Sequence, residues 1–391
     1  MPDPIYLDHA ATTPVRPEVL AAMAPFWDGR FGNPSSVHRW GRDARTALDE
    51  ARERVASCLG AGADEIIITS GGTEGDNLAI LGVWRMRRRA EHRNAVLTTP
   101  VEHKAVLGAT HQAAVEDGEE RICLMTSDGV VDERSFDQLA TREVAVASVM
   151  WVNNEIGTIQ PIHRLAELAQ SRGIVFHTDA VQAYGKVEID AKKTPFDLLS
   201  ISGHKIGAPK GCGAMYIRRG TPLEPLFHGG AQDRGRRPGT ENVAAVVGLA
   251  RAVELARDER VEEVVRLSAL RDRFESLVLA RIPDAVIHGR NAPQRAPHIT
   301  NVSVPGVDSE SMLMALDLRG IGCSAGSACQ SGSMSPSHVL AAIGVSRELA
   351  GAALRISFGC LNDDACVDRV ASVFGTLVEK ARGATPALTV A

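Results

Sequence analysis

Short runs of β-branched and aliphatic residues alternate, along the first half of the chain, with longer stretches whose apolar positions recur at helical spacing. The short runs predict buried strands at residues 65–70, 95–100, 144–152, 173–180 and 196–205. The longer stretches predict helices over residues 77–89, 104–118 and 161–173. Because strands separated by helices form parallel sheets with helices on their faces, we expect an α/β fold with a mostly parallel central sheet.

A second, smaller unit is expected towards the C-terminus. Residues 242–279 form a long amphipathic stretch, which predicts a connecting helical region. Beyond it, strand-like runs at 298–306 and 352–359 flank a helix-like run at 309–320. A chain of 391 residues is also too long for one core. We therefore predict a large domain over residues 15–255 and a smaller α/β domain made of residues 1–14 and 256–391.

Charge and composition exclude several classes of function. The formal net charge of -5 disfavours nucleic acid or an anionic membrane as the main partner. The basic run Arg85–Arg89 falls late in a predicted helix and is interpreted as its exposed face. No apolar run approaches the roughly 20 residues that span a bilayer, and the first residues lack a signal-peptide pattern. Seven irregularly spaced cysteines argue against a disulfide framework and indicate the reducing cytoplasm.

Polar side chains follow five of the predicted strands, at the point where each strand ends. Ligands of open α/β sheets bind at the carboxyl ends of the strands, so these side chains are expected to line one rim. They are Gly72 and Thr73, His103, Asn154, Asp179 and Gln182, and finally Ser202, His204 and Lys205.

The chemistry of this set suits pyridoxal 5'-phosphate (PLP). Gly72 and Thr73 begin a predicted helix, where backbone N–H groups can bind a phosphate, although an ordinary strand–helix turn would have the same pattern. Lys205 lies among small residues, where desolvation would favour a Schiff base over the usual solvated lysine. Asp179 could pair with a protonated ring nitrogen. His103 could either cap a helix or, as a catalytic residue, stack on the cofactor ring and move protons.

A late segment, "CSAGSACQSGSMSPSHV" over residues 323–339, carries a thiol among small polar residues. Nothing around Cys329 could pack a core, so the interpretation as a buried structural cysteine is disfavoured. A reactive thiol on a pliable loop fits better. The spacing between Cys323 and Cys329 is not that of a zinc site, and no histidine pair has zinc-helix spacing, so we expect no metal site.

Together these motifs resemble the cysteine desulfurases, PLP enzymes of the class V aminotransferase family and, by the small residues around the late cysteine, those of the iron–sulfur cluster assembly type. The resemblance extends through nearly the whole chain, in the motifs "YLDHAATTP", "FGNPSSVH", "TSGGTEGDNLAI", "EHKAVL", "VNNEIGTIQPI", "HTDAVQAYGK", "SGHKIGAPKGCGAMYIRR", "RRPGTENV", "GSACQSGSMSPSHVL" and "LRISFG". It implies the PLP-dependent transferase fold of fold type I.

The resemblance also implies a role for each site residue. Lys205 would hold PLP and move the α-proton of L-cysteine, and Cys329 would accept the sulfur as a persulfide while alanine leaves. Arg355 would bind the substrate carboxylate, and Asn154 would contact cofactor and substrate. Thr240 would reach the phosphate of the partner subunit in a homodimer. The remaining cofactor contacts would come from Gly72, Thr73, His103, Asp179, Gln182, Ser202 and His204.

Alternatives remain open at this point. A selenocysteine lyase shares nearly all of these residues, and another class V PLP enzyme shares most of them. A non-catalytic binding protein of the same fold should have lost Lys205 or Asp179, and this chain has both. The persulfide would pass to a sulfur-acceptor protein such as an iron–sulfur scaffold, whose identity the sequence does not give.

Overall fold

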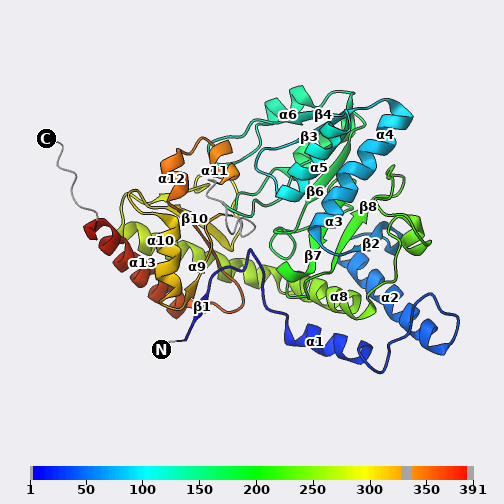
Figure 1. Cartoon of the computed structure of the whole chain (residues 1–391), viewed down its shortest axis with the longest axis horizontal. Helices are drawn as coiled ribbons and strands as arrows, with labels where there is room; N and C mark the ends of the chain where they lie inside the picture. Colours follow the sequence, from blue (N-terminus) through cyan, green and yellow to red (C-terminus); the bar gives the residue numbers. More distant parts are fainter. Residues whose placement is uncertain (1–2, 327–336, 385–391) are drawn as a thin grey trace.

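The computed structural model of the protein describes residues 3–326 and 337–384, and its central feature is a seven-stranded sheet (Figure 1). The strand order is β2-β8-β7-β6-β5-β3-β4, and β8 runs antiparallel to both of its neighbours while all other pairs are parallel. The α/β fold with a mostly parallel sheet is thus confirmed. The strands are β2 (Ile66–Thr69), β3 (Ala95–Thr98), β4 (Glu119–Ile122), β5 (Val144–Ser148), β6 (Val175–Asp179), β7 (Leu198–Ser202) and β8 (Gly213–Ile217).

Helices cover both faces of this sheet because its strands are apolar on both sides. Successive side chains of a strand point to opposite faces. Ile66 and Ile68 accordingly join one apolar cluster, whereas Ile67 joins another on the other face. The first cluster packs on α1 (Pro17–Met23), α2 (Arg39–Cys58), α6 (Glu133–Leu139), α7 (Ile162–Ser171) and α8 (Val243–Asp258). The second packs on α4 (Val83–Glu91), α5 (Lys104–Val115) and the π-helical turn Leu78–Gly82 that follows α3 (Gly72–Asn77).

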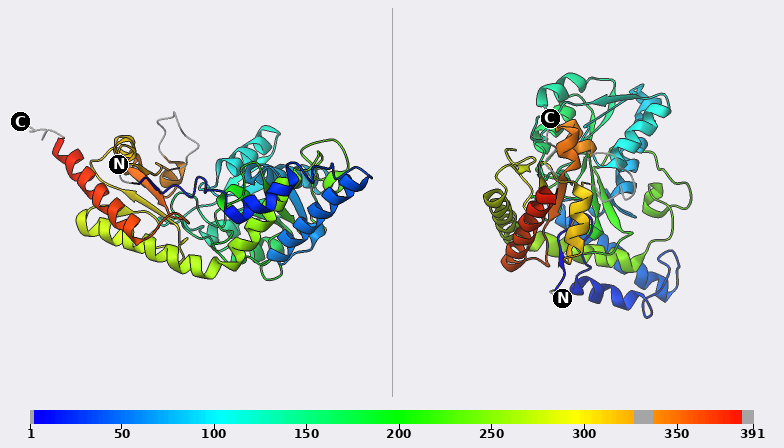
Figure 2. Two further views of the ribbon diagram at one scale, coloured as in Figure 1. Left: turned by 90° about the horizontal axis from the view of Figure 1, so that it is seen from below. Right: turned by 60° about the vertical axis from the view of Figure 1, so that its left-hand side comes forward.

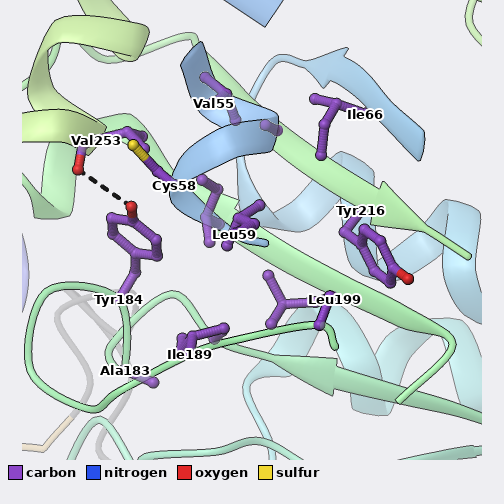
Figure 3. Close-up of a cluster of buried hydrophobic side chains, with 14 of the residues drawn as sticks. Val55, Cys58, Leu59, Ile66, Ala183, Tyr184, Ile189, Leu199, Tyr216 and Val253 are labelled. Atoms are coloured by element: carbon purple, nitrogen blue, oxygen red, sulfur yellow. Dashed lines mark hydrogen bonds between the residues drawn. The ribbon is translucent and has the colours of Figure 1, made fainter. Parts of the chain in front are cut away.

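Figure 3 shows part of the first cluster, where the last turn of α2 meets the sheet. Cys58 and Leu59 lie against residues of the loop after β6, and the Tyr184 hydroxyl donates to the carbonyl of Val253 in α8 over 3.1 Å. A buried tyrosine keeps its hydroxyl satisfied in this way. The contact joins α8 to the loop after β6, so the sheet and its helices form one continuous core.

A second group of elements surrounds a three-stranded antiparallel sheet of order β12-β10-β9. Its strands are β9 (Val286–Ile287), β10 (Ile299–Ser303) and β12 (Ala353–Ser357), and its helices are α9 (Arg260–Arg281), α10 (Ser309–Asp317), α11 (His338–Ala342), α12 (Arg347–Gly351) and α13 (Asp364–Ala384). Phe274, Phe358 and Phe374 meet edge to face in the apolar cluster between α9, α13 and this sheet. Among the helices of the described residues, none is long and apolar enough to cross a membrane.

The N-terminal segment packs with this second group. Strand β1 (Ile5–Tyr6) pairs in parallel with β11 (Ile321–Gly322), and Ile5 and Leu7 belong to the same apolar cluster as the three phenylalanines. The predicted connecting region is two helices, α8 and α9, which meet at Glu259; Figure 2 shows α9 reaching from α8 to the second group. The predicted domain boundary at residue 255 falls inside α8 and stays a prediction.

The basic run Arg85–Arg89 differs from the prediction of an exposed helix face. The side chain of Arg87 is buried. Its Nη1 donates to the carbonyl of Gly173 over 2.7 Å and to that of Ala145 over 3.3 Å, and its Nη2 pairs with Glu91 over 2.7 Å. A guanidinium can be buried when acceptors surround it. The prediction was wrong for Arg87 because these carbonyls come from β5 and from the turn before β6, far away in the sequence.

Replacing Arg87 by alanine should therefore destabilise the protein by about 2–4 kcal/mol, because buried carbonyl acceptors lose their donor. Urea unfolding followed by circular dichroism measures this loss. Arg89→Ala is the matched control in the same helix, since the Arg89 side chain is 62% exposed and pairs with Glu224 at the surface. Its cost should stay below about 1 kcal/mol. Equal costs for the two variants would contradict the structural role of Arg87.

Candidate active site

A cavity of about 240 Å³ lies at the carboxyl ends of the central strands, where the two groups of elements meet. Strand β2 leads into the start of α3, and β7 leads into the short helical turn Gly203–Lys205. The N-terminal segment and β12 close the cavity from the side of the second group. The lining residues are Ala10, Ala11, Gly72, Thr73, Asp76, His103, Met150, Asn154, Asp179, Val181, Gln182, Ser202, His204, Lys205 and Arg355.

The structure brings together all of the predicted site residues except two. Thr240 does not line this cavity and is exposed on the loop before α8. Cys329 lies outside the described residues. The convergence of strand-end residues on one rim, expected from the pattern of the sequence, is thus observed for nine residues from five strand ends, and Arg355, which the resemblance implied, joins them.

One end of the cavity is made by the turn between β2 and α3. Gly71 has a φ of 150°, which a residue with a side chain rarely adopts. A Cβ on Gly72 would lie 2.7 Å from Cγ2 of Val181, so both glycines are needed for the close approach. Opposite this turn, His204 lies 3.2 Å from the Thr12 hydroxyl through Nδ1. Burial, together with the charge of Lys205, lowers the pKa of His204 to about 4, so its ring is neutral at neutral pH.

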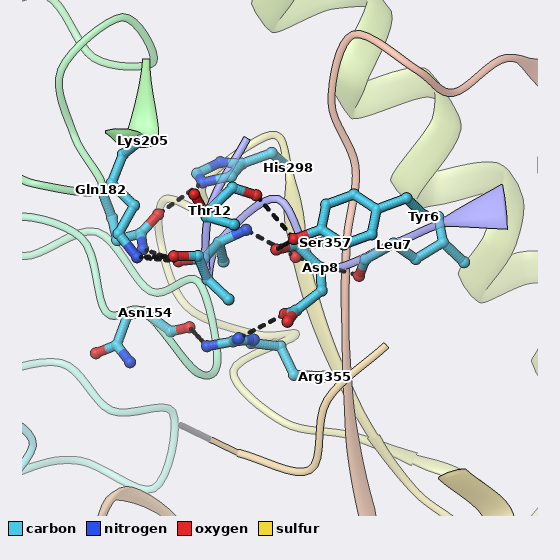
Figure 4. Close-up of polar contacts among 12 residues, drawn as sticks. Tyr6, Leu7, Asp8, Thr12, Asn154, Gln182, Lys205, His298, Arg355 and Ser357 are labelled. Atoms are coloured by element: carbon cyan, nitrogen blue, oxygen red, sulfur yellow. Dashed lines mark hydrogen bonds and ion pairs between the residues drawn. The ribbon is translucent and has the colours of Figure 1, made fainter. Parts of the chain in front are cut away.

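Lys205 is held by the N-terminal segment (Figure 4). Its ammonium Nζ donates to the carbonyl oxygens of Ala10 and Ala11, each over 2.6 Å. The amide of Gln182 donates to the same Ala10 carbonyl over 2.8 Å, and its oxygen lies 3.2 Å from Nε2 of His298. These backbone carbonyls therefore orient the Lys205 side chain along one wall of the cavity.

Asp179 and His103 form the floor of the cavity. Asp179 ends β6, and its Oδ1 accepts the amide of Val181 over 2.8 Å. Burial raises the pKa of Asp179, while the charges of His103 and Lys205 act in the opposite direction. The Nδ1 of His103 accepts the Ala105 amide over 3.1 Å and so caps α5. The cap interpretation of His103 is confirmed, and its stacking on a cofactor ring stays a prediction.

Arg355 reaches the cavity from β12 and is 1% exposed. Its Nη1 donates to the carbonyl of Asn154 over 2.9 Å, and its Nη2 pairs with Asp8 over 2.7 Å (Figure 4). The Nε has no hydrogen-bond partner among the described residues. The guanidinium is thus fixed in place with donor capacity left over.

The family model for class-V aminotransferases matches residues 5–370. The chain belongs to this family. It is 44% identical over 383 residues to a protein named cysteine desulfurase IscS from Dictyoglomus turgidum, covering 98% of this chain and 96% of that protein. A solved structure titled NifS-like protein has a TM-score of 0.90 at 34% identity, covering 96% of this chain and 100% of that one. Another, titled SspA in complex with cysteine, has a TM-score of 0.77 at 32% identity and covers 90% and 98%. The resemblance to cysteine desulfurases is confirmed.

Two residues at the cavity of this class-V family member were missed by sequence reasoning. Asp8 pairs with Arg355, and Asp76 lines the cavity close to Asp179. Asp8 lies in the motif "YLDHAATTP". A polar residue directly after a strand is a signal that could have pointed to it. Asp76 lies inside a helix, where an acidic residue gives no such signal. The acid oxygens of Asp76 and Asp179 and a ring nitrogen of His103 all lie within 4.8 Å of one another, and the expectation of no metal site stays a prediction.

The described cysteines differ in how readily they could react. Burial raises the pKa of Cys123, Cys212 and Cys323 to about 12. Such thiols stay protonated, and the thiolate is the nucleophile. Cys323 directly follows β11. These three are therefore poor candidates for sulfur transfer.

The chain on either side of residues 327–336 is tied to the rim of the cavity. The hydroxyl of Ser337 donates to Oε2 of Glu155 over 2.5 Å, and Nε2 of His338 lies 2.9 Å from the carbonyl of Glu102. A Cβ on Gly326 would lie 3.2 Å from the same Glu155 oxygen. Glu155 is buried and belongs to the loop after β5. Both ends of the segment that contains Cys329 thus lie against one side chain near Asn154.

Glu102 should make stability depend on pH. It is fully buried, its carboxylate accepts the Thr99 hydroxyl and the Met150 amide, and burial raises its pKa to about 8. An unfolded glutamate has a pKa of roughly 4.3, so the folded protein binds this proton more tightly. The stabilising contribution is complete at acid pH and is lost as the pH rises from roughly 4.3 to about 8.

Urea unfolding across this range should show a smaller fall in stability with pH for Glu102→Gln than for the wild type. The exposed Glu50→Gln serves as the control, and its slope should equal that of the wild type. An unchanged slope in Glu102→Gln would show that the pKa of Glu102 is the same in the folded and the unfolded protein, and would contradict the prediction.

Proposed function

We propose that this protein is a PLP-dependent cysteine desulfurase. The net reaction takes L-cysteine and the thiol of Cys329 to L-alanine and a persulfide on Cys329. The observation that carries the proposal is the cavity itself, in which the Lys205 amine, the Asp179 carboxylate and the Arg355 guanidinium meet at the strand ends. The relatives named cysteine desulfurase, at 44% identity over nearly the whole chain, support the same reaction.

The residues of the cavity fit PLP. A phosphate suits the end formed by Gly72, Thr73, Ser202 and the neutral ring of His204, where a Cβ on Gly72 would fill the space. Asp179 suits a protonated ring nitrogen, and Gln182 a ring hydroxyl. His103 would lie against the ring. PLP, when bound, supplies an electron sink for the α-carbon of an amino acid.

Each charged side chain then has a task toward the amino-acid substrate. Lys205, aimed by the Ala10 and Ala11 carbonyls, holds the cofactor and then moves the α-proton of the substrate. Arg355, whose Nε is unpaired among the described residues, binds the substrate carboxylate beside Asn154. The relative titled as a complex with cysteine supports an amino acid of this size in the cavity.

The sulfur step balances without a further reactant. The Cys329 thiolate attacks the sulfur of the bound cysteine, an S–S bond forms, and the C–S bond breaks with its electron pair staying on the β-carbon. Protonation of that carbon completes alanine, and the sulfur remains as a persulfide. It then passes to an acceptor protein such as an iron–sulfur scaffold. A thiol in this role needs reach, which the small residues around Cys329 allow.

The covalent link of the cofactor is testable directly. Protein loaded with PLP should be yellow, and borohydride reduction followed by peptide mapping should mark Lys205. Lys205→Ala should lose the covalent mark, because no other lysine lines the part of the cavity that the structure describes. A mark on the nearby Lys210, in the wild type or the variant, would overturn the assignment.

Cys329→Ala should release almost no sulfide from L-cysteine, whereas it should load PLP normally because Lys205 and the phosphate end are intact. Cys360→Ala is the control, since Cys360 is exposed outside this cavity and should leave sulfide release unchanged. Mass spectrometry should place one extra sulfur on the Cys329 peptide. Wild-type sulfide release by Cys329→Ala would refute the role. Parallel assays with selenocysteine separate a desulfurase from a selenocysteine lyase.

A homodimer is part of the proposal. Large apolar side chains are exposed along α1, the following turn and α2, including Trp27 and Phe31 at 67% each and Trp40 at 54%. Patches of this kind mark protein–protein contacts. Thr240 is exposed on a loop whose Asp233 pairs with Arg52 of α2, so it lies near the same surface.

Sedimentation velocity should accordingly show a dimer for the wild type and a shift to monomer for Phe31→Glu, since a buried charge at an interface is costly. Leu318→Glu places the same charge on a residue that is 84% exposed on the far group of elements, and it should stay dimeric. A wild type that sediments as a monomer would refute this part of the proposal.

A further inference from the structure

A second carboxyl group, that of Asp76, lies close to Asp179 in the lining of the cavity. Asp76 is 1% exposed, and neither of its oxygens has a hydrogen-bond partner among the described residues. It lines the cavity, and a carboxylate oxygen lies within 4.8 Å of both Asp179 and a ring nitrogen of His103. A buried carboxyl group without partners is costly when charged, so its presence calls for a role.

The Ser200 hydroxyl faces Asp76 and favours its charged form, but burial and the charge of Asp179 outweigh it and raise the pKa of Asp76. His177 Nε2 is 3.6 Å from Asp76 Oδ1, but burial lowers the pKa of His177 to about 3 and keeps the ring neutral. The His177 ring makes two hydrogen bonds, one between Nδ1 and the Ser148 hydroxyl at 2.8 Å and one between Nε2 and the Ser200 hydroxyl at 3.0 Å. The other titratable groups nearby are the acids Asp179 and Glu102, and His103, whose pKa is lowered by burial.

Asp179 has the better environment for a charge. It accepts the amide of Val181, and His103 and Lys205 both act on it in favour of the ionised form. Two acids at this separation in a dry site cannot both ionise readily, so one proton stays with the pair. The surroundings place that proton on Asp76 and the charge on Asp179.

We propose that Asp76 is a positioning residue that stays a neutral carboxylic acid and donates a hydrogen bond to Asp179. The pair then presents one negative charge to the cavity, which Asp179 would offer to the ring nitrogen of the cofactor. This inference rests on the proposed function for its purpose, because Asp179 is there the partner of that nitrogen. The protonation state of Asp76 is a property of the protein without cofactor and can be measured there.

Infrared difference spectra of the full-length protein without cofactor test this protonation state. The wild type minus Asp76→Asn should show the C=O stretch of a protonated carboxylic acid at neutral pH. A carboxylate band in its place would overturn the inference. Neither outcome depends on PLP or on cysteine turnover, so failure of the desulfurase proposal leaves this result intact.

The coupling of the two acids is tested by removing the partner's charge. In Asp179→Asn, Asp76 should ionise at lower pH, with its proton affinity reduced about tenfold or more. Asp197→Asn is the control, because Asp197 accepts the Phe176 amide at the other end of the same strand. It should leave the titration of Asp76 unchanged. An Asp76 titration that is the same in Asp179→Asn as in the wild type would refute the shared proton.

The positioning role is read from the absorbance titration of PLP-loaded protein. Asparagine at position 76 is neutral and can still donate to Asp179, so its titration should match the wild type. Alanine cannot donate, and it should shift the apparent proton affinity of the chromophore about tenfold, the worth of a hydrogen bond to a charged group. A shift in Asp76→Asn as large as that in Asp76→Ala would indicate a charged Asp76, and no shift in either would indicate a merely structural residue. Either of these results would overturn the proposal.

Discussion

The buried guanidinium of Arg355 holds the cavity together. A charge that is 1% exposed must be compensated, and its partners come from the N-terminal segment, through Asp8, and from the loop after β5, through the Asn154 carbonyl. Arg355 itself belongs to β12 of the second group. Three regions of the chain are therefore fixed relative to one another by one side chain.

The N-terminal segment extends this arrangement to the cofactor side. Its Ala10 carbonyl accepts from both Lys205 and Gln182, and the amide of Ala10 donates to the Ser357 hydroxyl over 2.9 Å. The wall is made of backbone, which cannot rotate away as a side chain could. The segment that follows β1 thus orients the side chain of Lys205. The position of that segment depends in turn on the ion pair between Asp8 and Arg355.

Much of the fold and site could be predicted because the signals are local. The apolar runs gave strands such as β3 and β6, and the polar residue after each strand gave Asp179 and Lys205, since parallel strands end at one rim. The burial of Arg87 could not be predicted, because its acceptors come from other strands. Asp76 was missed for a similar reason: it comes close to Asp179 of β6 only when α3 packs against the neighbouring strand β7. The role of Cys329 rests on sequence alone.

The contact between Asp8 and Arg355 joins residues 347 positions apart. At the usual 5–20 residues per second, a ribosome needs roughly 20–70 s to travel between them. Throughout that time the N-terminal segment lacks its ion pair, and its strand partner β11 and the rest of the apolar cluster around Ile5 and Leu7 come only from the last third of the chain. The wall behind Lys205 is consequently among the last parts of the molecule to form, and the cavity is complete only after almost the entire chain has been made.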